Sequence, residues 1–181
     1  MHHETELAWL QRECAKTNTF EELADVGVQE LRKFHHGGGF VCGPISTGGL
    51  GSMEKNNEVF QATIAYLQAK GEEVFNQHPY EEAMIRLREE WWKQPENTGK
   101  YCTPIMDVFY ARVFDTGLIT KAWFIPGWES SVGARWEREY YSRSGVEIVD
   151  LTPEFTAEAL AAYRTNTQSP PAETGGLAMT S

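Results

Sequence analysis

The sequence predicts an α/β fold of the flavodoxin or Rossmann type, with three layers in which helices cover both faces of a parallel sheet of four to five strands. Short apolar runs that indicate buried strands alternate with longer segments whose apolar residues recur at helical spacing. Glycine and proline separate the two kinds of segment. Strands that alternate with helices form parallel sheets joined by right-handed crossovers. We therefore expect one α/β domain over residues 38–164, preceded by a helical extension over residues 1–37.

The N-terminal extension carries apolar residues at the spacing of one or two helices between residues 5 and 34. Thr19 and Glu22 form a capping-box pattern at the start of the second helix. A glycine-rich break follows, and Phe40–Cys42 then indicates a short buried strand. We expect these N-terminal helices to be an appendage to the domain proper.

The first βαβ unit runs from the strand at Phe40–Cys42 to a second strand at Glu73–Asn76. Between them, Asn56–Lys70 carries its apolar residues on one helical stripe, and Gly71 ends that helix. The remaining expected elements are helices over 79–92, from Thr103–Pro104, over 131–143 and from Thr152–Pro153, with strands over 122–125 and 146–149. Residues 165–181 are rich in Pro, Thr, Ser and Gly and are expected to be disordered.

Charge and cysteine content exclude several classes of function. The 181 residues include 16 basic and 26 acidic side chains, and the net charge of -10 opposes attraction to nucleic acid or to an anionic membrane. Three widely spaced cysteines without a CxxC pair indicate neither a disulfide framework nor a zinc site. No apolar run approaches the length of a membrane-spanning helix. We expect a cytoplasmic protein that binds neither nucleic acid nor membranes.

The segment from Pro126 to Glu137 carries the strongest functional signal. Pro126 and Gly127 end an apolar strand, and Ser130 or Ser131 can cap the helix that follows. Glu137 then lies over the carboxyl edge of the sheet, where open α/β sheets bind their ligands. The exposed N–H groups at a helix start attract anions. A carboxylate beside an anion site predicts a phosphorylated sugar as the ligand.

A glycine-rich loop follows the first strand and is a second candidate for ligand contact. Gly43, Pro44, Ile45 and Ser46 begin it, and its missing side chains let backbone N–H groups approach a ribose or a phosphate. The loop has neither the Gly-Lys-Ser/Thr ending of a P-loop nor the GxGxxG pattern of a dinucleotide site. An NTPase or a dehydrogenase is therefore disfavoured, and we expect no cofactor and no metal.

Four sequence features occur in one order along the chain. They are Cys42-Gly43-Pro44-Ile45-Ser46, Asn56 four residues before Phe60, Pro126-Gly127-Trp128-Glu129, and Ser131-Val132-Gly133-Ala134 followed by Glu137. Over about residues 40–150 this ordered set resembles the nucleoside 2-deoxyribosyltransferase superfamily. It is most similar to an often phage- or prophage-borne group with a GPM or GPI loop and a PGWxxSxGAxxE segment.

The resemblance implies an N-glycosidic activity in which Glu137 attacks the anomeric carbon and forms a glycosyl-enzyme while the base departs. Ser131 stands where relatives that act on nucleosides have an acid and relatives that act on 5'-monophosphates have Ser. A hydroxyl at a helix start donates to a phosphate, whereas a carboxylate would repel it. We therefore expect hydrolysis or base exchange on a (deoxy)nucleoside 5'-monophosphate.

The resemblance also implies further substrate contacts. The segment that holds Ser131 adds Gly133, and Asn56 either fixes the glycine-rich loop or caps the next helix. Asn76 and His78 resemble an Asn-x-His found after the second strand in some nucleotide-hydrolysing relatives. Trp128 borders the expected cleft and is a candidate for stacking on the base.

The acids that help the base to leave depart from the family pattern. The two positions where relatives usually have Asp fall on Arg112 and Thr120 here, so Asp107 or Asp115 would have to substitute. Loss of those acids leaves a second hypothesis open, a nucleotide-binding or sensor module without turnover. A dinucleotide or another N-glycosidic metabolite is a more distant alternative. Aromatic pairs such as Trp91-Trp92 indicate an extended apolar surface, and proteins of the family that the sequence resembles commonly assemble into oligomers. We therefore expect a homodimer or a higher homo-oligomer.

Overall fold

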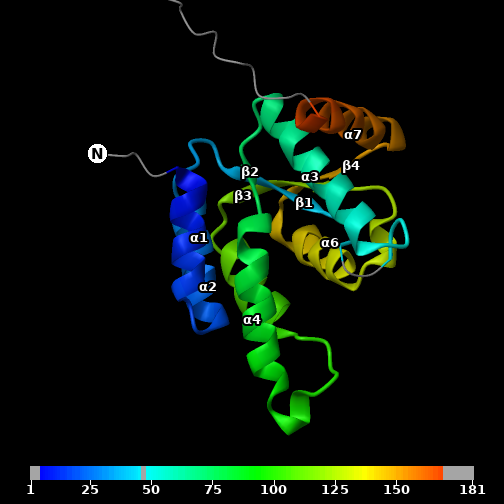
Figure 1. Ribbon diagram of the computed structural model, residues 1–181. Helices are drawn as coiled ribbons and strands as arrows, with labels where there is room; N and C mark the ends of the chain where they lie inside the picture. The colour runs from blue at the N-terminus through cyan, green and yellow to red at the C-terminus, as the bar shows by residue number, and fades with distance from the viewer. Residues whose placement is uncertain (1–4, 46–47, 169–181) are drawn as a thin grey trace, which may run out of the picture.

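A four-stranded parallel sheet forms the centre of the computed structural model, which describes residues 5–45 and 48–168 (Figure 1). The strands are β1 (Gly38–Cys42), β2 (Val74–Phe75), β3 (Ile119–Phe124) and β4 (Glu147–Asp150), in the order β2-β1-β3-β4. All three strand pairs are parallel. The predicted α/β class with a parallel sheet is confirmed, with four strands.

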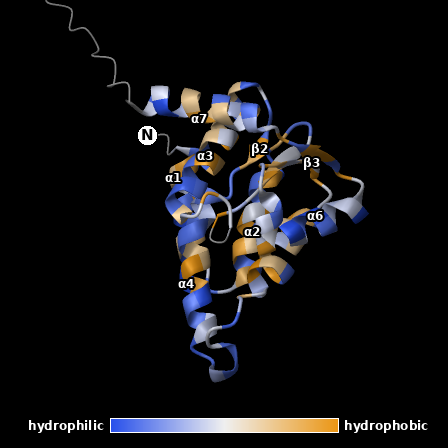
Figure 2. Ribbon diagram, turned by 90° about the vertical axis from the view of Figure 1, so that its right-hand side faces the viewer, coloured by the Kyte–Doolittle hydropathy of each residue, from blue (hydrophilic) through white to orange (hydrophobic). Residues whose placement is uncertain are grey.

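Helices cover both faces of the sheet because alternate strand residues point to opposite sides. Phe40 and Cys42 of β1 belong to one core cluster and Val41 to another. The Val41 face is covered by α3 (Met53–Ala69) and α7 (Pro153–Gln168). The Phe40 face is covered by α2 (Phe20–Leu31), α5 (Ala111–Phe114) and α6 (Val132–Ser144). Figure 2 shows the strands as largely hydrophobic and the surrounding helices as mixed.

The two N-terminal helices belong to the main core and do not stand apart from it. These helices are α1 (Glu6–Lys16) and α2, which starts at Thr19, whose hydroxyl accepts from the N–H of Glu22 at 3.1 Å. Leu23 of α2 lies in the same core cluster as Phe40. Although they precede the α/β unit in sequence, α1 and α2 therefore share its core.

The region between β2 and β3 contains the helices that form one wall of the site described below. A 3₁₀ turn, η1 (His78–Tyr80), leads into α4 (Glu81–Trp92), and a second turn, η2 (Pro95–Asn97), follows it. The helix predicted from Thr103–Pro104 begins as a π-helical segment, η3 (Ile105–Tyr110), before it continues as α5. π-Helical turns widen a helix and are frequent at functional sites.

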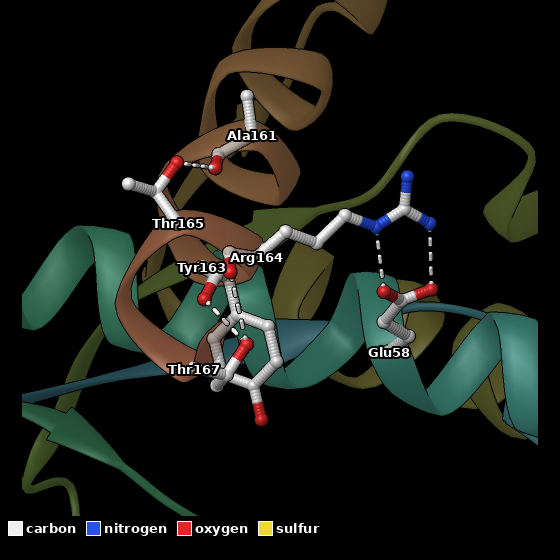
Figure 3. Close-up of polar contacts among 6 residues, drawn as sticks. All are labelled: Glu58, Ala161, Tyr163, Arg164, Thr165 and Thr167. Carbon is white, nitrogen blue, oxygen red and sulfur yellow. Dashed lines mark hydrogen bonds and ion pairs between the residues drawn. The ribbon is translucent and has the colours of Figure 1, made fainter. Parts of the chain in front are cut away.

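The last helix extends beyond the predicted domain end at Arg164. Arg164 forms two hydrogen bonds to Glu58 of α3, at 2.7 and 2.9 Å, and so ties α7 to α3 (Figure 3). Thr165 and Thr167 donate to the carbonyls of Ala161 and Tyr163 one turn earlier. These bonds satisfy the hydroxyls within a helix, so the expectation of disorder from residue 165 is wrong for residues 165–168. Residues 169–181 lie outside the described part of the chain.

None of the helices within residues 5–45 and 48–168 is both long and apolar enough to cross a membrane.

Candidate functional site

The chain reverses its direction of winding between β1 and β3, which are neighbours in the sheet. After β1 it passes to α3 on one face, and after β3 it passes to α6 on the other. Such a switch point opens a crevice at the carboxyl ends of the strands. A cavity of about 300 Å³ lies there, lined by the loop after β1, the segment after β2, α3, α4, the segment before and within η3, and α6.

Glu137 is a buried carboxyl group in this cavity. It lies on α6 and is 8% exposed. Burial raises the pKa of Glu137 to about 7, and a hydrogen bond from the Cys42 thiol partly offsets that rise. Cys42 ends β1, so the carboxyl lies against the strand end. Glu137 is thus available both as an acid and as a carboxylate near neutral pH.

Ser131 and Gly133 bring the N-terminal turn of α6 into the same cavity. Ser131 is the N-cap residue, and its hydroxyl oxygen accepts from the N–H of Ala134 at 3.3 Å. The side chain is also buried and lines the cavity. Of the two serines expected as candidates for the cap, Ser131 takes that role. The cavity therefore contains a carboxyl group and a helix N-terminus from one helix.

The glycine-rich loop contributes to the cavity through Gly43 and Ile45, whereas Pro44 faces a separate pocket between α3 and α7. Ser46 lies outside the described residues. Asn56 fixes this loop: its side chain accepts from the N–H of Leu50 at 2.8 Å and donates to the carbonyls of Ile45 and Gly48 at 3.1 and 3.0 Å. The helix cap is Ser52 instead.

A bridge between two loops holds the glycine-rich segment against the end of β3. The Ser130 hydroxyl accepts from the N–H of Gly49 at 2.8 Å and donates to the carbonyl of Gly127 at 2.6 Å. Gly49 has a φ of +66°, and a Cβ there would lie 2.4 Å from the Asn56 side-chain oxygen. The position therefore requires glycine on both counts.

The two candidate assisting aspartates lie outside the cavity. Asp107 and Asp115 are both exposed, and Asp115 accepts a hydrogen bond from the hydroxyl of Tyr140. Arg112, at one of the two positions where the sequence resemblance led us to expect an acid, forms an ion pair with Asp25 of α2. Thr120 is also exposed. Neither Asp107 nor Asp115 is brought to Glu137.

Three other residues that were predicted to contact the substrate also lie outside the cavity. The ring of Trp128 packs edge-on against Phe124, and the guanidinium of Arg138 lies 4.8 Å from its centre. Asn76 accepts from the N–H of His78 at 3.0 Å. His78 in turn lines a separate pocket, with its Nδ1 3.2 Å from a carboxylate oxygen of Glu81. Glu81 itself lines the cavity.

The sequence analysis did not identify several cavity residues, chiefly Gln77 and the α4 residues Glu81 and Arg88, and Tyr110 also lines the cavity. The Tyr110 hydroxyl donates to the Gln77 side-chain oxygen at 2.6 Å. Burial raises the pKa of Tyr110, and so do the charges of Glu137 and Glu81, because both carboxyls lie near it. Glu81, Ile85 and Arg88 recur at helical spacing directly after a strand end, a signal that could have identified this wall.

Large apolar side chains are exposed around the mouth of the cavity. Met53, Ile85 and Tyr101 line it and are 60%, 47% and 46% exposed, and Val132 beside Ser131 is 40% exposed. These four residues form what we call the apolar rim. Residues of this kind gathered at one place on a surface indicate contact with another molecule.

Comparisons with protein-family models, curated proteins and solved structures gave no match. Among the described residues, no group of three or more His, Cys, Asp or Glu side chains is arranged to hold a metal. The function is therefore inferred from this cavity and from the sequence motifs that line it.

Proposed function

We propose that the protein cleaves the N-glycosidic bond of a (deoxy)nucleoside 5'-monophosphate, with Glu137 as the nucleophile. The observation that carries the proposal is the buried Glu137 carboxyl in a cavity at the carboxyl edge of the sheet, beside the N-terminal turn of α6. The sequence motifs that resemble the nucleoside 2-deoxyribosyltransferase superfamily support the same assignment.

The reaction has two balanced steps. A Glu137 oxygen bonds to C1' of the sugar while the C1'–N bond breaks and its electron pair leaves with the base, which takes up a proton. Water, or a second base, then attacks C1', gives up one proton and releases the Glu137 carboxylate, which gives hydrolysis or base exchange and restores the proton used in the first step. Splitting one displacement into two steps lowers each barrier, as in retaining glycosidases.

The ionisation of Glu137 sets the pH range of this chemistry. Only the carboxylate attacks C1', and the pKa of about 7 leaves roughly half of it ionised at neutral pH. The first step should therefore accelerate as the pH rises to about 7 and level off above it. The same burial removes water from the attacking oxygen and from the sugar.

The N-terminal turn of α6 supports a phosphate as part of the substrate. Ser131 offers a hydroxyl at the helix cap, and the following N–H groups carry the positive end of the helix dipole. Because Ser131 both caps the helix and lines the cavity, its two roles are compatible. We infer that this turn binds the 5'-phosphate.

Glu81 is the carboxyl group best suited to protonate the leaving base. Asp107 and Asp115 are exposed and lie outside the cavity, whereas Glu81 lines it and is near Tyr110, as Glu137 is. The Nδ1 of His78 lies 3.2 Å from a carboxylate oxygen of Glu81 and helps to fix the position of that carboxyl. Glu81 would then take the role that the sequence resemblance gives to an aspartate.

One observation favours the alternative of a binding module without turnover. The two aspartates nearest the family positions both lie outside the cavity, so a sensor that lost its assisting acids would look the same. Such a protein would bind a nucleotide in this cavity and release no base.

We infer that the active form is a homodimer or a higher homo-oligomer. Met53, Ile85 and Tyr101 of the apolar rim line the cavity, and the fourth member, Val132, is exposed next to Ser131, which also lines it. Covering it with a second copy would bury these side chains and close the cavity to water.

Release of free base from a panel of nucleoside monophosphates and nucleosides tests the proposal. Wild type should release base from a monophosphate, and Glu137→Gln should reduce the rate by about 10³-fold or more. Glu139→Gln, on the exposed side of the same helix, should retain wild-type activity. Equal and negligible release by wild type and Glu137→Gln would favour the binding module.

A further inference from the structure

Arg88 is a cation in the same cavity that has no anionic partner among residues 5–45 and 48–168. It lies on α4 and is one of the residues that line the cavity with Glu137. Its Nε is fully buried and has no hydrogen-bond partner within the described part of the chain. Stacking on the ring of Trp92, 4.8 Å away, holds the guanidinium in place.

A buried guanidinium N–H without an acceptor is costly, and buried polar groups in folded proteins nearly always have a partner. The carboxyls of the cavity are engaged elsewhere: Glu81 is hydrogen-bonded to His78, and Glu137 to Cys42. An Arg in such a position indicates a partner that arrives with the ligand. An anion is that partner, because guanidinium carries five donors and no acceptor.

The surroundings of Arg88 connect it to the N-terminal turn of α6. The charge of Arg88 acts on the thiol of Cys102 and lowers its pKa against the larger, raising effect of burial. The neighbouring Tyr101 places its hydroxyl 3.9 Å from where a Cβ would lie on Gly133, in the first turn of α6. The segment Tyr101–Cys102 is therefore near both Arg88 and the N-terminal turn of α6.

We propose that Arg88 binds a phosphate group of the ligand and acts together with the N-terminal turn of α6 at Ser131. Guanidinium forms two parallel hydrogen bonds to a phosphate. A cation is favourable here because the Glu137 carboxylate faces the same cavity and repels a phosphate dianion. The identity of that ligand as a nucleoside monophosphate rests on the proposed function; anion binding by Arg88 does not.

The proposal assigns substrate selection to Arg88. A nucleoside without its 5'-phosphate would leave the guanidinium without a partner, so the cavity should prefer the phosphorylated form. Removing the guanidinium should weaken binding of the monophosphate and of inorganic phosphate, and leave binding of the nucleoside unchanged.

Calorimetric titration with inorganic phosphate, and with the deoxynucleoside monophosphates and their nucleosides, tests this on the full chain. Arg88→Met should lower the affinity for phosphate and for the preferred monophosphate at least tenfold, and Arg88→Lys should retain part of it. Arg143→Met removes an equal charge from the far end of α6, where Arg143 pairs with Glu139, and should bind as wild type does.

Thermal unfolding provides a second measurement and shows whether each variant folds. Phosphate should raise the melting temperature of wild type and of Arg143→Met, but not of Arg88→Met. Equal stabilisation of Arg88→Met, or no phosphate binding by wild type, would overturn the assignment. If phosphate binding depends on Arg88 while no nucleotide loses its base, the inference stands and the proposed enzyme does not. If base is released but Arg88→Met binds nucleotides and nucleosides as wild type does, the proposed enzyme stands and the inference about Arg88 does not.

Discussion

Glu137 is a residue whose burial has a measurable consequence without any substrate. Its carboxyl has a pKa of 4.5 when unperturbed and about 7 in the folded chain. The folded state therefore binds this proton more tightly, and the resulting stability is fully present below pH 4.5 and is lost as the pH rises through 7. The difference corresponds to roughly 3 kcal/mol at most.

We predict that the Glu137→Gln variant lacks this loss of stability. Urea denaturation at a series of pH values should show wild type losing stability between pH 5 and 8 relative to Glu137→Gln, because glutamine does not ionise. Glu139→Gln should follow wild type, since Glu139 is exposed. Parallel curves for wild type and Glu137→Gln would mean that the carboxyl is solvated in the folded protein.

The role of Glu81 predicts a dependence on the leaving base. Glu81→Gln should slow base release from an ordinary purine monophosphate by about 10²-fold or more, the usual contribution of a general acid. It should have little effect on an N7-methylguanosine monophosphate, whose base is already cationic and leaves without protonation. Glu137→Gln should be impaired on both substrates. Equal impairment of Glu81→Gln on both would assign Glu81 to binding instead.

The candidate site was only partly predictable residue by residue. Glu137, Ser131 and Gly133 come to one cavity because they lie on one helix at the end of a strand, which local sequence determines. Glu81 and Arg88 were missed because the orientation of α4 depends on its packing against the N-terminal helices α1 and α2. Asp107 and Asp115 were placed by counting along a regular helix, whereas η3 is π-helical.

In the loop after β1, the cost of steric overlap can be measured separately from the cost of backbone strain. Gly49 and Gly51 both have positive φ, of +66° and +82°. A Cβ on Gly49 would overlap Asn56 and Pro44, whereas one on Gly51 would meet nothing within 4 Å. Gly51→Ala should cost about 1 kcal/mol from the backbone alone, and Gly49→Ala about 1–3 kcal/mol more from the overlap. Chemical denaturation measures both, and equal losses would contradict the described loop geometry.

The ends of the helices agree with the sequence prediction where a capping residue or a glycine marks them. The helices capped by Thr19 and Ser131 begin where the sequence predicted. Strand β3 begins at Ile119, three residues before its predicted start, because Ile119 and Lys121 pair with Gly38 and Gly39 of β1, with Thr120 at a register shift between them. The extension of α7 past Arg164 depends on its ion pair with Glu58 of α3, a contact far apart in sequence.

For the whole molecule, the apolar rim predicts self-association. Ile85→Lys should shift a homo-oligomer toward monomer, because it places a charge at the proposed contact. Leu7→Lys is the matched control, since Leu7 is 52% exposed on α1 and lies outside the rim. Sedimentation velocity measures the change. A wild type that stays monomeric at all concentrations, or an equal effect of both variants, would contradict this contact.

The overall architecture was predictable because the alternation of strands and helices and the apolar runs determine it. Phe40, Val41 and Cys42 are all apolar, which fits a strand buried on both faces. The integration of α1 and α2 into the core was not predictable, since an amphipathic helix does not reveal which surface it covers. Leu23 and Leu31 pack into that core and are fully buried.

The central claim is that Glu137 bonds to C1' of a nucleotide sugar. Incubation with a 2'-fluoro-2'-deoxynucleoside monophosphate, whose fluorine slows release of the sugar, followed by mass spectrometry of the intact protein and its peptides, tests it most directly. We predict a mass increase of one sugar phosphate on the peptide that contains Glu137, and none in Glu137→Gln. Base release without an adduct, or an adduct on another residue, would contradict the claim.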